Sequence, residues 1–263
     1  GERPQGTAHW LPCWLGKEEG MELEHEHTSK AIRERLQEGH RPNYLRDWIY
    51  GGIDGAVTTF AVTAGVAGAS LSPTIVLILG LANLIADGFS MAAANYSGTK
   101  TEYDDMLRLA EVEKKHIALV PEGEREEIRQ ILANKGLTGS ALEEAVAAIT
   151  SNEKVWIDTM LTEEYGLSPS VPNPLVAALY TFWAFVTCGI VPLIPFVLGV
   201  SNAFRWSVLA TGVVFFAIGS IKSRWSLAPW WRSGLETLII GMSAAGLAYA
   251  VGYLLRNLVG VDV

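Results

Sequence analysis

Two aspartates interrupt stretches of the sequence that are otherwise apolar. Asp54 and Asp87 are the only ionisable residues well inside these two stretches. Burying a carboxylate in a membrane costs roughly 3 kcal/mol even on the lenient insertion scales, so these residues indicate a function. Asn83, Asp87 and Met91 recur every four residues and therefore lie along one face of a helix. A carboxylate together with a thioether suits a divalent ion such as Fe(II) or Mn(II) better than Ca²⁺ or Mg²⁺.

Simpler interpretations of the same residues stay open. Asp54 follows Asp47 by only seven residues and could mark a helix end at the water interface. Met91 could be a packing residue, because methionine commonly fills gaps between helices. Asp87 lies deeper and is paired with Asn83, so it is harder to explain in this way.

A second group of candidate metal ligands occurs between about 98 and 173. Three predicted helices each carry two such residues, three or four positions apart and hence on one face. They are Glu113 and His116, Glu124 and Glu127, and Met160 and Glu164. The Glu-x-x-His spacing is used by di-metal carboxylate sites in helix bundles. Charged helix faces are usually just solvated, so the prediction depends on the three faces converging.

The composition indicates the elements that must position these residues. The chain has 263 residues, 49% of them hydrophobic, yet it carries 20 Lys and Arg and 28 Asp and Glu. The charges are dense between 100 and 164 and sparse in 47–99 and 175–263, which is a membrane, soluble, membrane order. A membrane-spanning helix needs roughly 20 mostly apolar residues. Five windows qualify, at about 48–71, 74–97, 174–199, 205–222 and 234–255.

We therefore predict an all-α membrane protein with five transmembrane helices and a cytosolic helical metal-binding domain inserted between the second and third. The predicted divisions are an N-terminal cytosolic segment with an amphipathic helix (1–46), transmembrane helices one and two (47–97), the inserted domain (98–173) and transmembrane helices three to five (174–263). All of the 20 basic residues except Arg205 and Arg256 then share one side. The positive-inside rule places that side, with the N-terminus and the insert, in the cytosol.

Helix breakers and capping patterns divide the insert. The second span continues without a breaker to Leu119 and ends before Pro121. Further helices are predicted over 124–134, from a capping box that begins at Ser140, and over 155–165.

Other residues predict how the spans pack. Pro192 and Pro195 should kink the third span and free carbonyl groups that the protein or a cavity must satisfy. Gly51-x-x-x-Gly55 in the first span should allow close helix contact, either within the chain or across a dimer.

Several classes of function and site are disfavoured. A net charge of −8 without clustered Lys and Arg argues against nucleic acid as a partner. Cys13 and Cys188 are far apart in the sequence, which makes neither a disulfide framework nor a thiolate zinc site credible. Residues 1–46 contain no apolar run long enough for a secretory signal. His25 and His27 either capture metal or are simply exposed, and no function is assigned to residues 1–20.

Three motifs occur in order within the first three predicted spans. They are Asp54-Gly-Ala-Val-Thr-Thr-Phe60 followed by Gly65-Val-Ala-Gly68, Ala86-Asp-Gly-Phe-Ser-Met91, and Cys188-Gly-Ile-Val-Pro-Leu-Ile-Pro-Phe196. Together they resemble the vacuolar iron transporter family, over about 45 to 255 and including the position of the insert. The resemblance implies a five-helix homodimeric exporter that moves Fe(II), and often Mn(II) or related ions, out of the cytosol in exchange for protons.

The resemblance also implies roles for individual residues. The translocation path would lie at the dimer interface, lined by the first two spans, with Asp54 as its carboxylate and Met91 as its thioether ligand. The insert is similar to the family's cytosolic metal-binding domain, whose ligand positions match the six insert residues named above. His116 stands where a carboxylate is expected in the plant members, so the preference among Fe, Mn, Co and Zn stays open. These ions would be transported, and no permanently bound cofactor is expected.

Two other functions stay open at this point. A membrane-anchored di-iron ferroxidase would use Glu113-x-x-His116, although that architecture needs two such units and two further glutamates. A metal sensor or buffer would need neither Asp87 nor Met91 within the membrane. For a transporter, we hypothesise that metal displaces protons from Asp54 and the insert carboxylates, because carboxylates in a low-dielectric site bind protons more readily. The membrane is either a bacterial inner membrane or that of a vacuole-like organelle.

Overall fold

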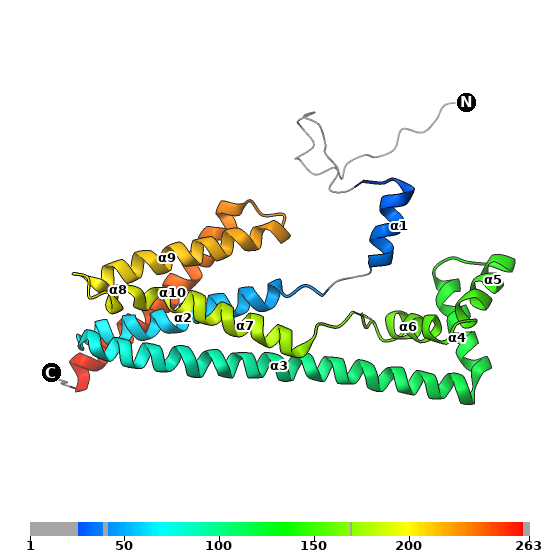
Figure 1. Cartoon of the computed structure of the whole chain (residues 1–263), viewed down its shortest axis with the longest axis horizontal. Coiled ribbons are helices and arrows are strands. Elements are labelled where there is room, and N and C mark those ends of the chain that lie inside the picture. Colours follow the sequence, from blue (N-terminus) through cyan, green and yellow to red (C-terminus); the bar gives the residue numbers. More distant parts are fainter. Residues whose placement is uncertain (1–25, 39–41, 169, 260–263) are drawn as a thin grey trace, which may run out of the picture. The chain divides into compact units, whose positions relative to one another are not determined.

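The computed structural model describes residues 26–38, 42–168 and 170–259, which contain helices joined by turns and loops and no strand (Figure 1). The helices are α1 (Ser29–Glu38), α2 (Leu45–Gly68), α3 (Pro73–Leu119), α4 (Pro121–Asn134), α5 (Gly139–Thr150), α6 (Glu153–Glu163), α7 (Pro174–Gly189), η1 (Val191–Leu193), α8 (Ile194–Val197), α9 (Ala203–Lys222), η2 (Ser223–Trp225) and α10 (Trp230–Val259). The all-α prediction is confirmed for these ranges.

The N-terminal segment, up to Arg41, forms a unit of its own. Its helix α1 begins after Thr28, whose hydroxyl accepts a hydrogen bond from the Ala31 backbone N–H at 3.2 Å and so caps the first turn. A helix is therefore present within the predicted 1–46 segment. His25 and residues 1–20 lie outside the described residues.

Four helical segments of the described chain are long and apolar enough to cross a membrane. They are Pro73–Leu119, Pro174–Val197, Ala203–Trp225 and Trp230–Leu258, and they correspond to four of the five predicted spans. The remaining prediction, 48–71, corresponds to α2, which has 24 residues but is not among these four. Glycines, threonines and two aspartates dilute its apolar composition.

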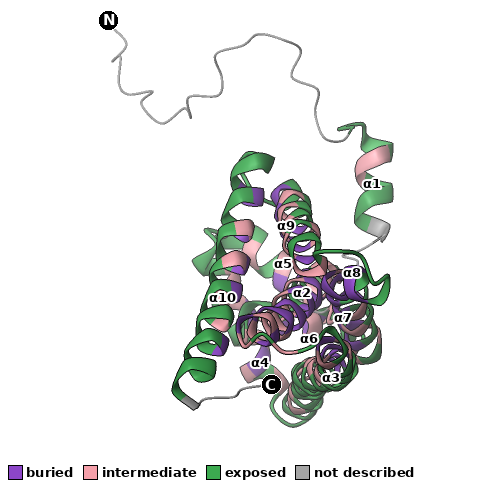
Figure 2. Cartoon of the chain, turned by 90° about the vertical axis from the view of Figure 1, so that its left-hand side faces the viewer, coloured by how far each residue is buried: buried purple, intermediate pink, exposed green. Residues whose placement is uncertain are grey.

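Helix α2 lies at the centre of the bundle. It packs against α7, α10, α3 and α9, and 12 of its 24 residues are buried, whereas most residues of the outer helices α3 and α10 are exposed (Figure 2). A Cβ atom at Gly51 or Gly55 would overlap the backbone carbonyl of Thr181 or Phe185 in α7. The small residues therefore serve close packing within the chain, which was one of the two predicted uses.

The third predicted span is broken near its prolines. Helix α7 ends at Gly189, and the chain continues through η1 and the short α8, which contain Pro192 and Pro195. At this break the Ser207 hydroxyl on α9 donates a hydrogen bond to the Pro192 carbonyl at 2.7 Å. The kink, and a protein group that bonds a carbonyl there, are both as predicted.

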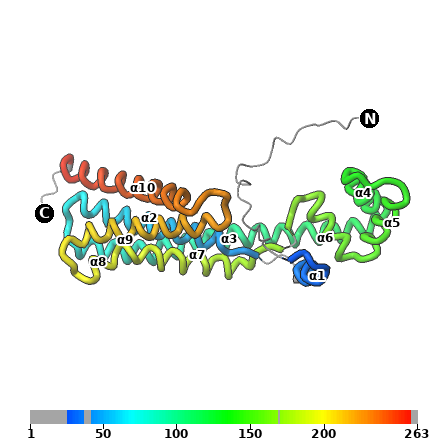
Figure 3. Tube along the Cα trace, turned by 90° about the horizontal axis from the view of Figure 1, so that it is seen from above, coloured from blue at the N-terminus to red at the C-terminus, as the bar shows by residue number. Residues whose placement is uncertain are grey.

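Helix α3 joins the bundle to the insert (Figures 1 and 3). Its 47 residues extend roughly 70 Å at 1.5 Å per residue, and they end at Leu119 as predicted. Helices α4, α5 and α6 pack around Ile128, Val146 and Trp156 at its far end. The predicted capping box is wrong, because α5 begins at Gly139 and Ser140 therefore lies inside it.

Candidate metal-binding sites

Three of the predicted insert ligands gather where α3 turns into α4. Glu113 and His116 lie on the last turns of α3, and Glu124 lies on the first turn of α4, which starts at Pro121. One ligand atom from each of the three residues lies within 4.8 Å of the others. His116 Nδ1 is 3.5 Å from Glu124 Oε1 and 4.0 Å from Glu113 Oε1. The tight α3–α4 turn thus brings two carboxylates and an imidazole to one point.

The two carboxylates of this insert cluster are buried and incompletely paired. Glu113 is 1% exposed and Glu124 is 5% exposed. The Oε2 atom of each has no hydrogen-bond partner among the described residues. An unpaired buried polar group costs about 1–3 kcal/mol, and more when it is charged. A divalent cation beside His116 would recover that cost.

Glu127 and Glu164 add negative charge to the same place. Burial, together with the Glu127, Glu113 and Glu164 carboxylates, raises the pKa of Glu124 to about 7. The pKa of Glu164 is also raised, first by burial and then by Glu113 and Glu127. Five of the six predicted insert ligands therefore lie in the cluster or interact with it electrostatically. This agrees with the prediction that the three helix faces converge.

Met160 has different surroundings from the other five. Its side chain is fully buried in the apolar core of the insert with Ile128, Val146 and Trp156. The structure therefore gives it a packing role, and its predicted role as a thioether ligand stays a prediction.

Tyr165 is a member of the site that the sequence analysis missed. Its hydroxyl donates a hydrogen bond to Glu113 Oε1 at 2.9 Å, which leaves Glu113 Oε2 free. Burial and Glu113 together raise the pKa of Tyr165, so the phenol keeps its proton and remains a donor. The residue directly follows Glu164, but no spacing rule in the sequence connects it with Glu113, which is 52 positions away.

The second group of predicted ligands lies where α2 faces α3. Asp54 is in the third turn of α2, and Asp87 on α3 is close enough to interact with it electrostatically. Asp54 is therefore an interior helix residue, which removes the helix-end interpretation. Asn83, Asp87 and Met91 are all partly buried along one face of α3, and Asn83 Nδ2 is buried with no hydrogen-bond partner in the described part of the chain.

Asn83, Asp87 and Met91 form a polar column along α3, and a hydrogen-bonded network continues this column toward the insert. Asn95 Nδ2, four residues beyond Met91, donates to Asp47 Oδ1 at 2.9 Å and to Thr181 Oγ1 at 2.7 Å. These three residues join α3, α2 and α7, and Asp47 is only 7% exposed. The sequence analysis missed the network, although extending the four-residue repeat of 83, 87 and 91 by one step reaches Asn95.

Comparison with known proteins decides the family. The model of the VIT family matches residues 45–253, which includes both candidate sites and the whole insert. This chain belongs to the VIT family.

Curated relatives agree over most of the chain. Vacuolar iron transporter 1 of Arabidopsis thaliana is 32% identical over 81% of this chain and 86% of its own length. Vacuolar iron transporter 1 of Oryza sativa subsp. japonica is 34% identical over 79% and 83%, respectively. The vacuolar iron transporter of Toxoplasma gondii is 30% identical over 84% and 77%. VIT family membership and the four apolar helices support an integral, multi-pass membrane protein that transports metal, and they fit a protein that is not an enzyme.

Proposed function

We propose that this VIT family member exports Fe(II), and also Mn(II), from the cytosol by exchange for protons. The observation that carries this proposal is that α3 bears both candidate sites. Met91 lies in its apolar half, and the insert cluster begins at Glu113 near its end. At 100° per residue the 22-residue separation puts Glu113 roughly 40° from Met91 around the helix, so both sites face the same side of it. The names of the relatives support iron as the ion.

Helix α2 is proposed as the fifth transmembrane helix. Its 24 residues extend roughly 36 Å, which exceeds the roughly 30 Å thickness of the hydrocarbon core. Its position among the four apolar segments shields Asp54 from lipid and explains why it needs less apolar composition than they do. With five spans, the N-terminus and insert share the cytosolic side by the positive-inside rule. The relatives' names favour a vacuole-type membrane over a bacterial inner membrane.

Proton exchange would begin at the insert. Because the pKa of Glu124 is about 7, this carboxyl is partly protonated at cytosolic pH, and an arriving cation displaces its proton. The ion would then pass to Asp54, Asp87 and Met91. Protons arriving from the opposite side of the membrane would compete for Asp54 and release it. The cytosolic cluster would thus collect the ion, and the membrane carboxylates would exchange it.

A homodimer would complete the path. Asn83, Asp87 and Met91 are only partly buried within one chain. Polar residues in a membrane normally face protein or water and not lipid. A second copy placed over this face would enclose the column and bring its own Asp54 and Met91 to the same path, which agrees with the interface implied by the motifs.

Two alternatives use the same insert. A ferroxidase would need a second Glu-x-x-His unit, but within the described ranges the three-residue cluster of Glu113, His116 and Glu124 is the one such group. A sensor or buffer would leave Asp87 and Met91 without a use. Both alternatives are therefore less well supported than transport.

Reconstitution of the full chain into liposomes tests the proposal. A trapped Fe(II)-sensitive dye and a pH dye would report metal and proton movement for the unmodified protein, for Asp54→Asn, and for Glu144→Gln, which removes an exposed carboxylate on α5. We expect opposite fluxes that Asp54→Asn abolishes and Glu144→Gln retains. Oxygen consumption on adding Fe(II) without flux would favour the ferroxidase. Metal binding without flux or oxygen consumption would favour the sensor.

A further inference from the structure

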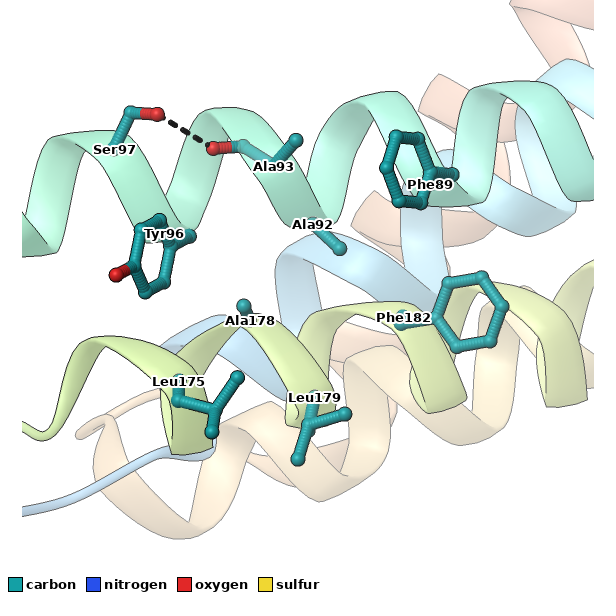
Figure 4. Close-up of a pocket in the computed structure, with 9 residues that line it drawn as sticks. All are labelled: Phe89, Ala92, Ala93, Tyr96, Ser97, Leu175, Ala178, Leu179 and Phe182. Carbon is teal, nitrogen blue, oxygen red and sulfur yellow. Dashed lines mark hydrogen bonds between the residues drawn. The ribbon is translucent and has the colours of Figure 1, made fainter.

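An open apolar groove runs between α3 and α7 on the surface of the bundle (Figure 4). It has a volume of about 490 Å³ and is bordered by Phe89, Ala93 and Tyr96 of α3 and by Leu175, Leu179 and Phe182 of α7. Phe89 is 70% exposed and Leu175 is 60% exposed. The alanines between the two helices leave room that larger side chains would fill. In water such a surface would be unfavourable, so its natural occupant is apolar.

The groove continues into a second, more polar cavity. This cavity, of about 470 Å³, shares Tyr96 and Leu175 with the groove and adds Tyr103, Lys100 and Asn173. It lies where α7 begins at Pro174 and where the apolar part of α3 gives way to charged sequence. The combined depression therefore changes from apolar to polar at one end of the membrane-spanning bundle, as a bound amphiphile requires.

We propose that this depression binds one anionic glycerophospholipid, with an acyl chain in the apolar groove and the phosphate beside Lys100. The Lys100 ammonium has three N–H donors, of which Asp104 Oδ1 and Oδ2 accept two, both at 2.8 Å. One donor is therefore left for a phosphate oxygen. Tyr96 and Tyr103 both line this cavity, and tyrosines are enriched at membrane surfaces. Lys100 is the one cation among the residues that line this cavity, and a cation next to the membrane on the cytosolic side is a typical partner of an anionic headgroup.

The position of the groove favours lipid over a second copy of the chain. Phe89 and Ala93 are each two residues from Met91, so the helical repeat places them roughly 160° away around α3. The polar column and the groove are thus on opposite flanks of the helix. A partner that encloses the column, as in the proposed function on which this step rests, would leave the groove facing lipid.

Lipid retention by the purified full chain tests the site. Native mass spectrometry would count bound phosphatidylglycerol and phosphatidylcholine during titration in detergent. Ala93→Trp fills the groove, and Val213→Trp makes the same kind of change at an exposed position of α9 outside it. Lys100→Gln removes the headgroup cation, and Lys154→Gln removes an exposed cation of the insert.

We expect one phosphatidylglycerol per chain to be retained in a saturable way by the unmodified protein and by both controls. Ala93→Trp should abolish this retention, and Lys100→Gln should weaken it about fivefold. Equal retention by Ala93→Trp and Val213→Trp would overturn the site. Equal binding of phosphatidylcholine, unchanged by Lys100→Gln, would overturn the headgroup assignment. A particle mass by light scattering that halves only in Ala93→Trp would identify the groove as a contact between copies and overturn the lipid. Retention in a protein that moves no metal would refute only the proposed function.

Discussion

Replacing Glu124 with glutamine should relieve electrostatic strain in the insert while removing a proposed metal ligand. Glu124 is buried against other carboxylates, which raises its pKa from the usual 4.5 to about 7. A carboxyl whose pKa is raised by folding contributes its full stabilisation below the unfolded value. That contribution is lost as the pH rises from 4.5 through 7. This residue therefore makes the metal-free insert less stable at pH 8 than in acid.

The size of the effect follows from the shift. A change from 4.5 to about 7 at about 1.4 kcal/mol per pKa unit gives about 3–4 kcal/mol as an upper value. Glu124→Gln keeps the side-chain shape and stays neutral, so it should recover up to this amount at pH 8 and almost none in acid. Metal at 100 times its Kd should stabilise the unmodified protein by about 2.7 kcal/mol, and most of that gain should disappear in the variant.

Hydrogen exchange measured by mass spectrometry on the full chain resolves these effects. Protection of the amides in α4 and α6, corrected for the intrinsic pH dependence of exchange, gives the local opening free energy. Glu144→Gln on α5 is the matched control, because it removes an exposed carboxylate. If Glu124→Gln leaves amide protection at pH 8 unchanged from that of the unmodified protein, the predicted electrostatic strain at Glu124 is refuted. Full protection of that variant by Mn²⁺ would refute the ligand role.

Three further changes test other parts of the molecule. Tyr165→Phe should weaken Mn²⁺ binding about tenfold in isothermal titration, because a supporting hydrogen bond to a ligand is lost, whereas Tyr103→Phe should not. Gly55→Ala should lower the free energy of unfolding by about 1–3 kcal/mol, since its Cβ overlaps the α7 backbone; Gly246→Ala, which has open space around it, is the control in thermal melts. One alanine inserted after Gly98 rotates the insert by roughly 100° and should abolish transport in liposomes, and four should restore part of it; equal loss in both would contradict the shared face of α3.

Most of the fold was predictable because its signals are local. Apolar windows gave four spans, Pro121 gave the end of α3, and Pro174 gave the start of α7. The capping box predicted at Ser140 was wrong because a capping pattern acts only where a helix starts. Gly139, with a φ of +63°, begins that helix one residue earlier. The composition of α2 reflects its central position, which depends on how all the other helices pack and is not encoded in its own window.

The candidate site was predictable only in part. Spacing along one helix placed Glu113 with His116 and Asn83 with Asp87, because a helix fixes such neighbours whatever the tertiary structure. Tyr165 reaches Glu113 from a different element, and that contact depends on how α6 docks on α3. The same dependence explains why helical spacing did not reveal the apolar surroundings of Met160.

Hydrogen bonding distinguishes the buried carboxylates that hold the fold from those available to an ion. Asp47 is about as buried as Glu124, but its Oδ1 accepts a hydrogen bond from Asn95, which also bonds Thr181. Its charge is thus used to fix α2 against α3 and α7. Glu113 and Glu124 each keep one buried oxygen that no described protein group satisfies. Because an unsatisfied buried carboxylate destabilises the fold until a cation or proton arrives, binding free energy is available at the insert cluster and not at Asp47. This difference supports the ligand role proposed for the insert pair and a positioning role for Asp47, although all three are acidic residues within helices.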